Sequence, residues 1–405
     1  METKHIVSEY TLDKCVHGTM IRKMSAYADE LRKLKGDENV HDLTLGNPQI
    51  PPPQEYLDAL IKISQTEEFL CHGYAPTTGL YEARKALAHI VDQFEEVIIQ
   101  PEHIIMTCGC AGACNVFLKT ILDPGDEVIM FSPYYLEYPF YIENYGGIVV
   151  EVPTHFEEKW QINKDELKKK LTNKTRCIII NSPNNPTGVV YTQETIDSVL
   201  KLAEEHSEKI GRPVWILNDD VYSRLRSPNV KIHSVFHYTY SVIAYSLSKD
   251  LSIPGERIGC LAVNPMIADN QQFVKTLATV NEILGFVHTN RLQMRIIPLL
   301  ERVTVDLSLY NKSRELICQC LDELGIEYVR PEGALFVFPK IDERFDEWEF
   351  CKTLADNGVV TVPGSSFGAK GFYRMSCCQH PNDLITNIKF FKIAFKETIK
   401  QLSSK

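Results

Sequence analysis

The sequence predicts an α/β protein in which a large domain, built on a doubly wound and mostly parallel β-sheet, is joined to a smaller α+β domain. Between about residues 75 and 265, helical patterns alternate with short runs rich in β-branched residues. This alternation is typical of parallel strands connected by helices. The runs are continuously apolar, as expected for strands covered on both faces. After about residue 265 long helical patterns replace the alternation, which indicates a second domain.

The elements of the large domain follow in order along the chain. Predicted helices over residues 77–94 and 111–122 each precede an apolar run. The predicted strands are 103–107, 126–131, 147–153, 176–183, 213–219 and 242–246. Their short length and their β-branched content favour strands over buried helices.

The rest of the chain predicts the smaller domain. Periodic apolar residues predict helices over 25–36, 266–284, 290–325, 347–358 and the C-terminus, with strands at 334–339 and 372–377. The prolines of segment 45–53 exclude a helix there. We therefore expect an N-terminal arm with part of the small domain (1–50), a large cofactor-binding domain (51–290), and a C-terminal small domain (291–405).

Charge and hydropathy limit the expected partners. The chain has 405 residues, with 43 Lys and Arg against 53 Asp and Glu, and a net charge of −10. Because no long basic run offsets this charge, neither nucleic acid nor an anionic membrane is expected as a partner. The N-terminus lacks the apolar core and cleavage site of a signal peptide, and no apolar span reaches membrane length. We expect a cytoplasmic protein that acts on small molecules.

The twelve cysteines are interpreted as reduced thiols. Many of them lie in apolar runs, where free cysteine behaves as a small hydrophobe. Two close pairs, Cys108 with Cys110 and Cys377 with Cys378, lack the C-x-x-C spacing of a zinc ribbon. We therefore expect no bound metal.

The segment SLSKDLSIPGERIG, residues 246–259, indicates a cofactor. It places Lys249 among small hydroxyl residues, eight positions before Arg257. A lysine amine forms a Schiff base with an aldehyde, and a guanidinium binds phosphate through paired hydrogen bonds. The two groups together predict pyridoxal 5'-phosphate.

Further segments lie at strand ends, where α/β sheets present their ligand-binding loops. NDDVY ends a strand with Asp219, a carboxylate that can keep a pyridinium nitrogen protonated, and places Tyr222 near the phenolic oxygen of the ring. NSPNNPTG follows another strand. TCGCAGAC leads from a strand into a helix whose N–H groups can bind phosphate, and Tyr135 of SPYY can stack on a planar ring.

With these motifs in this order, the chain resembles the class I and II aminotransferases among the pyridoxal phosphate-dependent enzymes of fold type I. The matching segments are LGNP, YAPTTGLYEAR, TCGCAGA, NSPNNPTG, NDDVY, SLSK with GERIG, PEGALFVF, PGSSFG and YRMS. They span nearly the whole chain, and the ordered set is specific although each motif alone is weak. The overall character is similar to the aspartate-aminotransferase-like branch.

The resemblance implies a role for each matching residue. Lys249 would form the Schiff base and move a proton between the substrate α-carbon and the cofactor. Asp219 would pair with the pyridinium nitrogen and Tyr222 with the phenolic oxygen, which completes the catalytic set. The other cofactor contacts would be Asn185 on the phenolic oxygen, Tyr135 on the ring face, and Arg257, Ser246 and the backbone of Cys110 and Ala111 on the phosphate.

The resemblance also implies substrate contacts and a partner subunit. Arg374 would bind the substrate α-carboxylate, with Asn185 and the backbone of Gly46 nearby. Tyr74 would reach the phosphate bound in the neighbouring subunit, which requires a homodimer. Family members that prefer dicarboxylates use a second arginine. The candidates by position are Arg22, Arg291 and Arg295.

The activity implied is a ping-pong aminotransferase. An α-amino acid would leave its amino group on the cofactor and depart as a 2-oxo acid, and a second 2-oxo acid would then take the amino group. We expect 2-oxoglutarate as acceptor and aspartate as the first donor to test, within a broad range. Two alternatives stay open. The same anchors support a lyase, a decarboxylase or an oxidative enzyme, and a non-catalytic regulator could reuse the fold.

Overall fold

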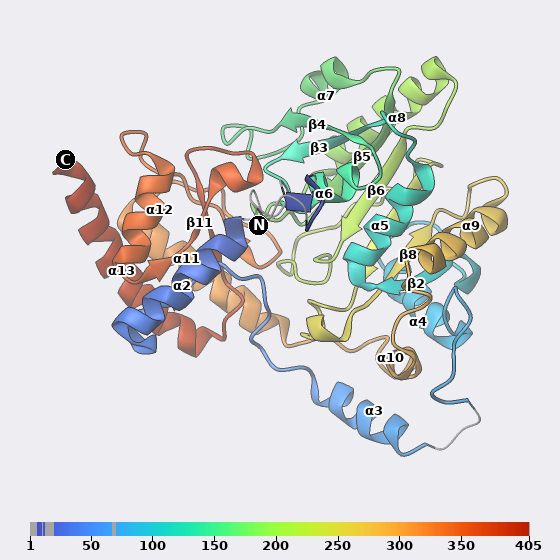
Figure 1. Cartoon of the computed structure of the whole chain (residues 1–405), viewed down its shortest axis with the longest axis horizontal. Helices are drawn as coiled ribbons and strands as arrows, with labels where there is room; N and C mark the ends of the chain where they lie inside the picture. Colours follow the sequence, from blue (N-terminus) through green and yellow to red (C-terminus); the bar gives the residue numbers. More distant parts are fainter. Residues whose placement is uncertain (1–5, 10, 13–19, 67–69, 405) are drawn as a thin grey trace.

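The computed structural model describes residues 6–9, 11–12, 20–66 and 70–404. Figure 1 shows a larger body around a twisted sheet and a smaller, mainly helical part on one side of it. The helices of the smaller part are α2 (Met20–Lys35), α11 (Leu307–Leu324), α12 (Glu347–Asp356) and α13 (Pro381–Ser403). Helix α3 (Gln54–Ser64) lies apart from both and contacts α10 (Arg291–Ile296).

A seven-stranded sheet forms the centre of the larger body. Its strands are β2 (Ile104–Cys108), β3 (Glu127–Ser132), β4 (Ile148–Pro153), β5 (Thr175–Asn181), β6 (Trp215–Asp220), β7 (Ser241–Ser246) and β8 (Ile258–Val263). They lie in the order β2-β8-β7-β6-β5-β3-β4. All pairs from β7 to β4 are parallel, whereas β8 is antiparallel to both of its neighbours. The mostly parallel sheet expected from the apolar runs is confirmed.

Helices cover both faces of this sheet. Helices α4 (Tyr81–Asp92) and α8 (Gln193–Ile210) pack in one apolar cluster, and α5 (Gly109–Ile121) and α9 (Asn270–Ile283) pack in another. Neighbouring strand residues alternate between the two clusters, as with Ile129 in the first and Met130 in the second. Because both sets of side chains are buried, the central strands carry continuous apolar runs, with polar residues at their ends, as in WILNDD of β6.

Strand β8 was not among the predicted strands. Its run IGCLAV follows the GERIG motif directly, and only residues 247–257 connect it to β7. A parallel crossover needs about a dozen residues or more, so this connection returns the chain antiparallel. The strand enters between β7 and β2, which brings Arg257 beside the start of α5.

The smaller part joins the two ends of the described chain. Strand β1 (His41–Asp42) pairs in parallel with β10 (Val359–Val360). A second small sheet has the order β11-β12-β9 and is antiparallel. Its strands are β11 (Val362–Pro363), β12 (Tyr373–Ser376) and β9 (Phe336–Val337). Residues before position 50 thus lie against the C-terminal third, while the boundaries at 50 and 290 stay predictions.

One predicted helix was wrong. The single helix expected over 290–325 is two helices, α10 and α11, separated by a 3-10 turn over Ile297–Leu299 and a loop. Pro298 lies in that turn, and proline cannot donate the backbone hydrogen bond that a continuing helix needs. Helix α11 starts afresh at Asp306, whose carboxylate accepts a hydrogen bond from the backbone N–H of Ser308.

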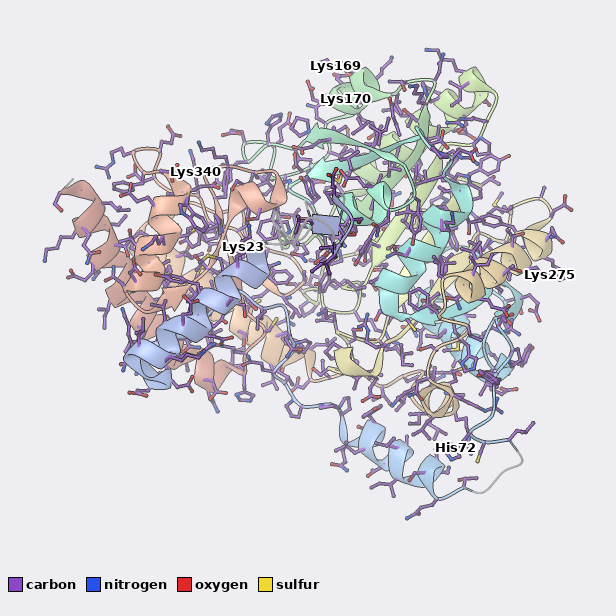
Figure 2. All side chains as sticks on the ribbon, in the orientation of Figure 1. Lys23, His72, Lys169, Lys170, Lys275 and Lys340 are labelled. Atoms are coloured by element: carbon purple, nitrogen blue, oxygen red, sulfur yellow. The ribbon has the colours of Figure 1, made fainter. Side chains whose placement is uncertain are left out.

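Charged side chains are distributed over the surface. Figure 2 shows the labelled Lys169, Lys170 and Lys275 at the outer surface of the molecule, and all three are exposed. Within the described residues, every helix is either too short or too polar to cross a membrane.

Gly259 of β8 marks the closest packing of this strand on helix α5. A Cβ atom at this position would lie 2.5 Å from the carbonyl carbon of Gly109 and 2.6 Å from the backbone oxygen of Tyr245. Both contacts are with backbone, which cannot move without shifting the start of α5. Only glycine therefore allows β8 and α5 to approach in this way.

We expect Gly259→Ala to lower the free energy of unfolding by about 1–3 kcal/mol, because the added methyl group overpacks this contact. Urea denaturation monitored by circular dichroism measures the loss. Gly255→Ala is the matched control, since a Cβ atom there meets nothing within 4 Å. Equal stability of the two variants would contradict the expected clash.

Candidate active site

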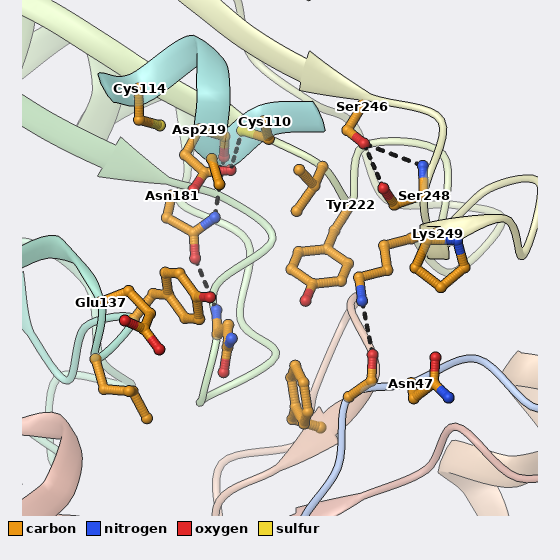
Figure 3. A pocket seen from close by; sticks show the side chains of 18 of the residues that line it. Asn47, Cys110, Cys114, Glu137, Asn181, Asp219, Tyr222, Ser246, Ser248 and Lys249 are labelled. Carbon is orange, nitrogen blue, oxygen red and sulfur yellow. Dashed lines mark hydrogen bonds between the residues drawn. The ribbon is translucent and has the colours of Figure 1, made fainter. Parts of the chain in front are cut away.

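A cavity of about 460 Å³ opens at the carboxyl ends of β5, β6 and β7, next to the start of α5. Its size lies within the range of small-molecule sites, about 300–1,000 Å³. The predicted site residues that line it are Gly46, Cys110, Ala111, Tyr135, Asn185, Asp219, Tyr222, Ser246, Lys249, Arg257 and Arg374. Figure 3 shows Asp219 with Cys110 on one side of the cavity and Lys249 with Ser246 on another, with Tyr222 between them.

Asp219 lies at the end of β6 and is buried. Each oxygen of its carboxylate accepts one hydrogen bond: Oδ2 from the hydroxyl of Tyr138 at 2.6 Å, and Oδ1 from the thiol of Cys110 at 3.2 Å. Burial raises the pKa of Asp219, and the two hydrogen bonds oppose that rise. The result is a buried acceptor group fixed on both sides. The roles of Tyr138 and of the Cys110 thiol were not predicted.

The loop after β5 orients its asparagines through the backbone. The side chain of Asn181 accepts a hydrogen bond from the backbone N–H of Asn185 at 2.8 Å and donates to the backbone oxygen of Asp219 at 2.9 Å. Asn184 accepts from Thr187 within the turn, so it is Asn185 that faces the cavity. Asn181 could have been suspected from its place at a strand end.

Lys249 lies just after β7 and points into the cavity. Its Nζ donates a hydrogen bond to the backbone oxygen of Gly46 at 2.6 Å (Figure 3). Burial lowers the pKa of Lys249, and the nearby cations Arg374 and Arg257 lower it further, against an opposing effect of Cys378. A buried lysine of this kind is closer to its neutral, nucleophilic form than one in water.

Arg257 and the start of α5 form a positively charged end of the cavity. Arg257 is exposed and adopts a left-handed backbone conformation, with Nη1 donating to the backbone oxygen of Pro254 at 2.9 Å. Its guanidinium lies against Gly109, the first residue of α5. Ser246 shares a hydrogen bond of 2.6 Å with Ser248 in the same region. A helix N-terminus beside a guanidinium attracts phosphate.

Arg374 of β12 is the most deeply buried cation in the cavity wall, at 1% exposure. Its guanidinium carbon lies 4.2 Å from the ring centre of Phe336 and 4.9 Å from that of Phe367. Nη1 donates to Asn185 Oδ1 at 2.9 Å, Nη2 donates to the backbone oxygen of Thr44, and Nε has no hydrogen-bond partner among the described residues. Burial lowers its pKa to about 10.

The two predicted tyrosines of the cavity are both buried to a large extent. Tyr135 packs edge-on against Tyr138 at 5.4 Å between ring centres, and Tyr222 packs edge-on against Phe336 at 6.2 Å. Burial raises the pKa of both hydroxyl groups, which therefore stay protonated at neutral pH. Tyr134, the alternative to Tyr135 in sequence, does not line this cavity.

Tyr74 is not brought together with the other predicted residues. It is 85% exposed and lies in a separate hollow with His288 and Arg291. Arg291 donates to the backbone oxygen of Tyr74 at 2.7 Å. Of the other candidates for a second arginine, Arg295 does not line the large cavity, and the side chain of Arg22 is outside the described residues.

Comparison with known proteins gives a consistent family. The family description "Aminotransferase class I and II" matches residues 38–388. A probable aspartate/prephenate aminotransferase of Aquifex aeolicus is 30% identical, over 92% of this chain and 95% of that protein. An aspartate aminotransferase of Thermotoga maritima is also 30% identical, over 85% of this chain and 88% of that protein.

Solved structures agree. An amino transferase from Eubacterium rectale superposes with a TM-score of 0.91 at 31% identity, covering 96% of this chain and 99% of the other. The aspartate aminotransferase from Thermus thermophilus with maleate gives a TM-score of 0.82 at 28% identity, covering 93% and 97%. The predicted fold type I is confirmed, and amino-group transfer is favoured over the lyase, decarboxylase, oxidative and regulatory alternatives. The chain belongs to the class I and II aminotransferases, the pyridoxal phosphate-dependent enzymes that move an amino group from an α-amino acid to a 2-oxo acid.

Proposed function

We propose that the cavity around Lys249 is the site where this chain binds pyridoxal phosphate and carries out amino transfer. Asp219 takes the pyridinium nitrogen, and Tyr222 with Asn185 takes the phenolic oxygen. Tyr135 faces the ring. The phosphate is held by Arg257, Ser246 and the backbone N–H groups of Cys110 and Ala111.

The charges in the cavity support this placement. Asp219 is a buried carboxylate that forms no salt bridge with the described residues, although burying an anion is costly without a counter-charge. A protonated ring nitrogen supplies that charge. At the positively charged end, Arg257 and the start of α5 suit a phosphate group. The residues present therefore fit the cofactor of the family.

The chemistry divides between the cofactor and the protein. When bound, pyridoxal phosphate acts as an electron sink that weakens the C–H bond at the substrate α-carbon. Lys249 Nζ accepts the α-proton, and burial, the largest cause of its lowered pKa, makes this amine easier to deprotonate than one in water. Asp219, held by Tyr138 and Cys110, keeps the charge at the ring nitrogen fixed. The aromatic walls around Arg374 exclude water from the substrate carboxylate.

The single observation that carries the substrate assignment is the state of Arg374. This guanidinium is buried, and in the described part of the chain its acceptors are the neutral oxygens of Asn185 and Thr44, while its Nε has no acceptor. A buried cation without an anion costs several kcal/mol, and a carboxylate is the geometric complement of a guanidinium. The α-carboxylate of a substrate that enters beside the Lys249 amine supplies both the missing negative charge and the acceptor for Nε.

We further propose aspartate as a donor and 2-oxoglutarate as the acceptor, within a broad range of amino acids. Relatives named aspartate or aspartate/prephenate aminotransferase support this choice. The cations that line the cavity in the described part of the chain are Lys249, Arg257 and Arg374. All three already have roles, so the second carboxylate needs an arginine from elsewhere. Arg291, in the hollow with Tyr74, is a candidate from a neighbouring subunit.

The reaction itself gives the main test. Purified protein loaded with pyridoxal phosphate and mixed with aspartate should convert the absorbance of the aldehyde form of the bound cofactor to that of its amine form. Addition of 2-oxoglutarate should reverse the change, because the two half-reactions are independent. A panel of α-amino acids that leaves the spectrum unchanged would contradict the proposed function. Release of ammonia or CO₂ without any acceptor would favour a lyase or decarboxylase.

Two variants separate the roles of the cavity residues. Lys249→Ala should lose both the spectrum of the lysine-bound cofactor and most turnover. Arg374→Lys should keep that spectrum but lose about 2–5 kcal/mol of transition-state stabilisation, at least about 30-fold in kcat/KM, because lysine keeps the charge but cannot form the paired hydrogen bonds that a buried guanidinium makes with a carboxylate. If Arg374→Lys also loses the absorbance of the cofactor bound to Lys249, Arg374 does more than bind the substrate.

The depressed pKa of Lys249 predicts a pH-dependent stability of the cofactor-free protein. Between that lowered pKa and 10.5, the value for an unperturbed lysine, the unfolded chain binds more protons than the folded chain. Stability attributable to Lys249 therefore rises with pH across this window. Lys249→Met, which removes the buried charge, should be more stable than the parent at neutral pH, and the gap should narrow toward pH 10.5.

Urea denaturation at several pH values measures this gap. Because the free energy of unfolding of the parent is subtracted from that of the variant at each pH, the contributions of the other titrating groups cancel. Lys275→Met, on an exposed position of α9 and labelled in Figure 2, is the control and should show no narrowing. A gap for Lys249→Met that stays constant with pH would contradict the depressed pKa.

We propose that the protein acts as a homodimer in the cytoplasm. Tyr74 is exposed in this chain although its motif belongs to the site, which fits a contribution to the neighbouring subunit. Sedimentation velocity should give the mass of a dimer, and Tyr74→Phe should weaken cofactor binding without altering that mass. A monomer with full activity would exclude the dimer.

The free cysteines of the described chain fit a reducing compartment such as the cytoplasm, and cell fractionation can test this location.

A further inference from the structure

Two cysteines and one carboxylate meet at the floor of the cavity. The thiol groups of Cys110 and Cys114 and a carboxylate oxygen of Asp219 all lie within 4.8 Å of one another. The Cys110 sulfur is 3.2 Å from Asp219 Oδ1. All three residues are buried, and all three line the cavity. Figure 3 shows them side by side, with Cys114 and Cys110 on α5 above Asp219.

The arrangement follows from the local fold. Cys110 and Cys114 are four residues apart on α5, so their side chains lie on the same face of the helix, one turn apart. That face packs on the sheet near the end of β6, where Asp219 lies. The parts of the chain that carry the three groups are a helix and a strand in the core, and these are rigid elements suited to hold a fixed set of ligands.

We propose that, when pyridoxal phosphate is absent, Cys110, Cys114 and Asp219 bind one thiophilic divalent cation such as Zn²⁺ or Cd²⁺. Two sulfur atoms and one oxygen supply three positions of a tetrahedral site, and the cavity leaves the fourth open to water. Zn–S bonds of about 2.3 Å and Zn–O bonds of about 2.0–2.2 Å place the ligand atoms of a tetrahedral site roughly 3.5–3.8 Å apart. The three ligand atoms here lie within 4.8 Å of one another, with 3.2 Å between the Cys110 sulfur and Asp219 Oδ1. Thiolate ligands select soft cations over Mg²⁺ or Ca²⁺.

The binding step has a defined proton balance. In the free protein the Cys110 thiol donates a hydrogen bond to Asp219 Oδ1 and so carries its proton, and Cys114 enters the binding step as a thiol as well. When the cation binds, each S–H bond is replaced by a metal–sulfur bond, and two protons pass to solvent. Asp219 binds through Oδ1 and keeps the hydrogen bond from Tyr138 on Oδ2.

The charges of the cavity favour this occupant. Two thiolates, one carboxylate and a divalent cation together carry one negative charge. Arg257 and Arg374, whose guanidinium groups stay charged, line the same cavity. A negatively charged metal centre therefore lies in a region of positive potential, which reduces the cost of burying it.

The same carboxylate is assigned above to the ring nitrogen of the cofactor, so the metal and pyridoxal phosphate exclude each other. This exclusion rests on the proposed function, whereas the metal site itself does not. The cofactor-free chain thus has an alternative ligand that prevents loading. Chelation of the cation restores the capacity to bind pyridoxal phosphate.

The direct test is a titration of the full-length, cofactor-free chain with CdCl₂. We expect one Cd²⁺ per chain, an ultraviolet thiolate-to-cadmium charge-transfer band, and the release of two protons in weakly buffered solution. MgCl₂ should give none of these signals. These readouts need no variant, so absence of the band at saturating Cd²⁺ overturns the site.

Variants locate the site. Cys110→Ala and Cys114→Ala should each weaken Cd²⁺ binding by at least about 100-fold, since loss of an outer partner alone already costs about 10–100-fold. Cys260→Ala is the matched control, because Cys260 is equally buried but packs in the apolar cluster on the other face of the sheet. Unchanged binding in both helix variants, or weakened binding in the control, overturns the assignment.

A competition arm tests the exclusion. Pyridoxal phosphate bound beforehand should protect the chain from Cd²⁺, and bound Cd²⁺ should slow cofactor loading until EDTA is added. Binding of Cd²⁺ through Cys110 and Cys114 without any effect on pyridoxal phosphate would overturn the exclusion and, with it, the place assigned to the ring at Asp219. If the parent chain carries out transamination normally but its cofactor-free form shows no cadmium–thiolate band, the metal site alone is overturned.

Discussion

Arg374 and Asp219 are buried charges of opposite sign that do not pair with each other or, among the described residues, with any other side-chain charge. The rest of the site is arranged around this condition. Apolar packing against Phe336 and Phe367 and hydrogen bonds to neutral oxygens hold the guanidinium in place without neutralising it. Tyr138 and Cys110 do the same for the carboxylate. Ligands with complementary charges recover the energy spent in burying both groups, so affinity is built into the fold.

The fold brings distant segments together for a simple geometric reason. Parallel strands end at one edge of a sheet, and the loops that follow β5, β6 and β7 therefore meet there. The smaller part closes the opposite side of the cavity, where β12 supplies Arg374 and the segment after β1 supplies Gly46. Neither part forms the site alone. This explains why the motifs are spread from residue 45 to residue 376.

Much of this arrangement could be predicted from the sequence, because strand-end motifs carry their geometry with them. Asp219, Asn185 and Lys249 follow apolar runs, and the structure has them at one cavity. Two predictions failed although the sequence carries a local signal. Pro298 interrupts the apolar periodicity of residues 290–325, and the apolar run of β8 directly follows the GERIG motif. The contacts of Tyr138 and of the Cys110 thiol with Asp219 have no local signal, because only tertiary packing brings these groups together.

The hydrogen bond from Lys249 to the Gly46 carbonyl links two parts of the protein that fold around different cores. Lys249 follows a strand of the large sheet, while Gly46 continues from β1, which pairs with β10 of the smaller part. The reactive amine is thus also a tether. A compound that bonds to this amine competes for the nitrogen atom that now holds the Gly46 carbonyl. A chemical change at Lys249 Nζ therefore bears directly on a contact between the large sheet and the segment after β1.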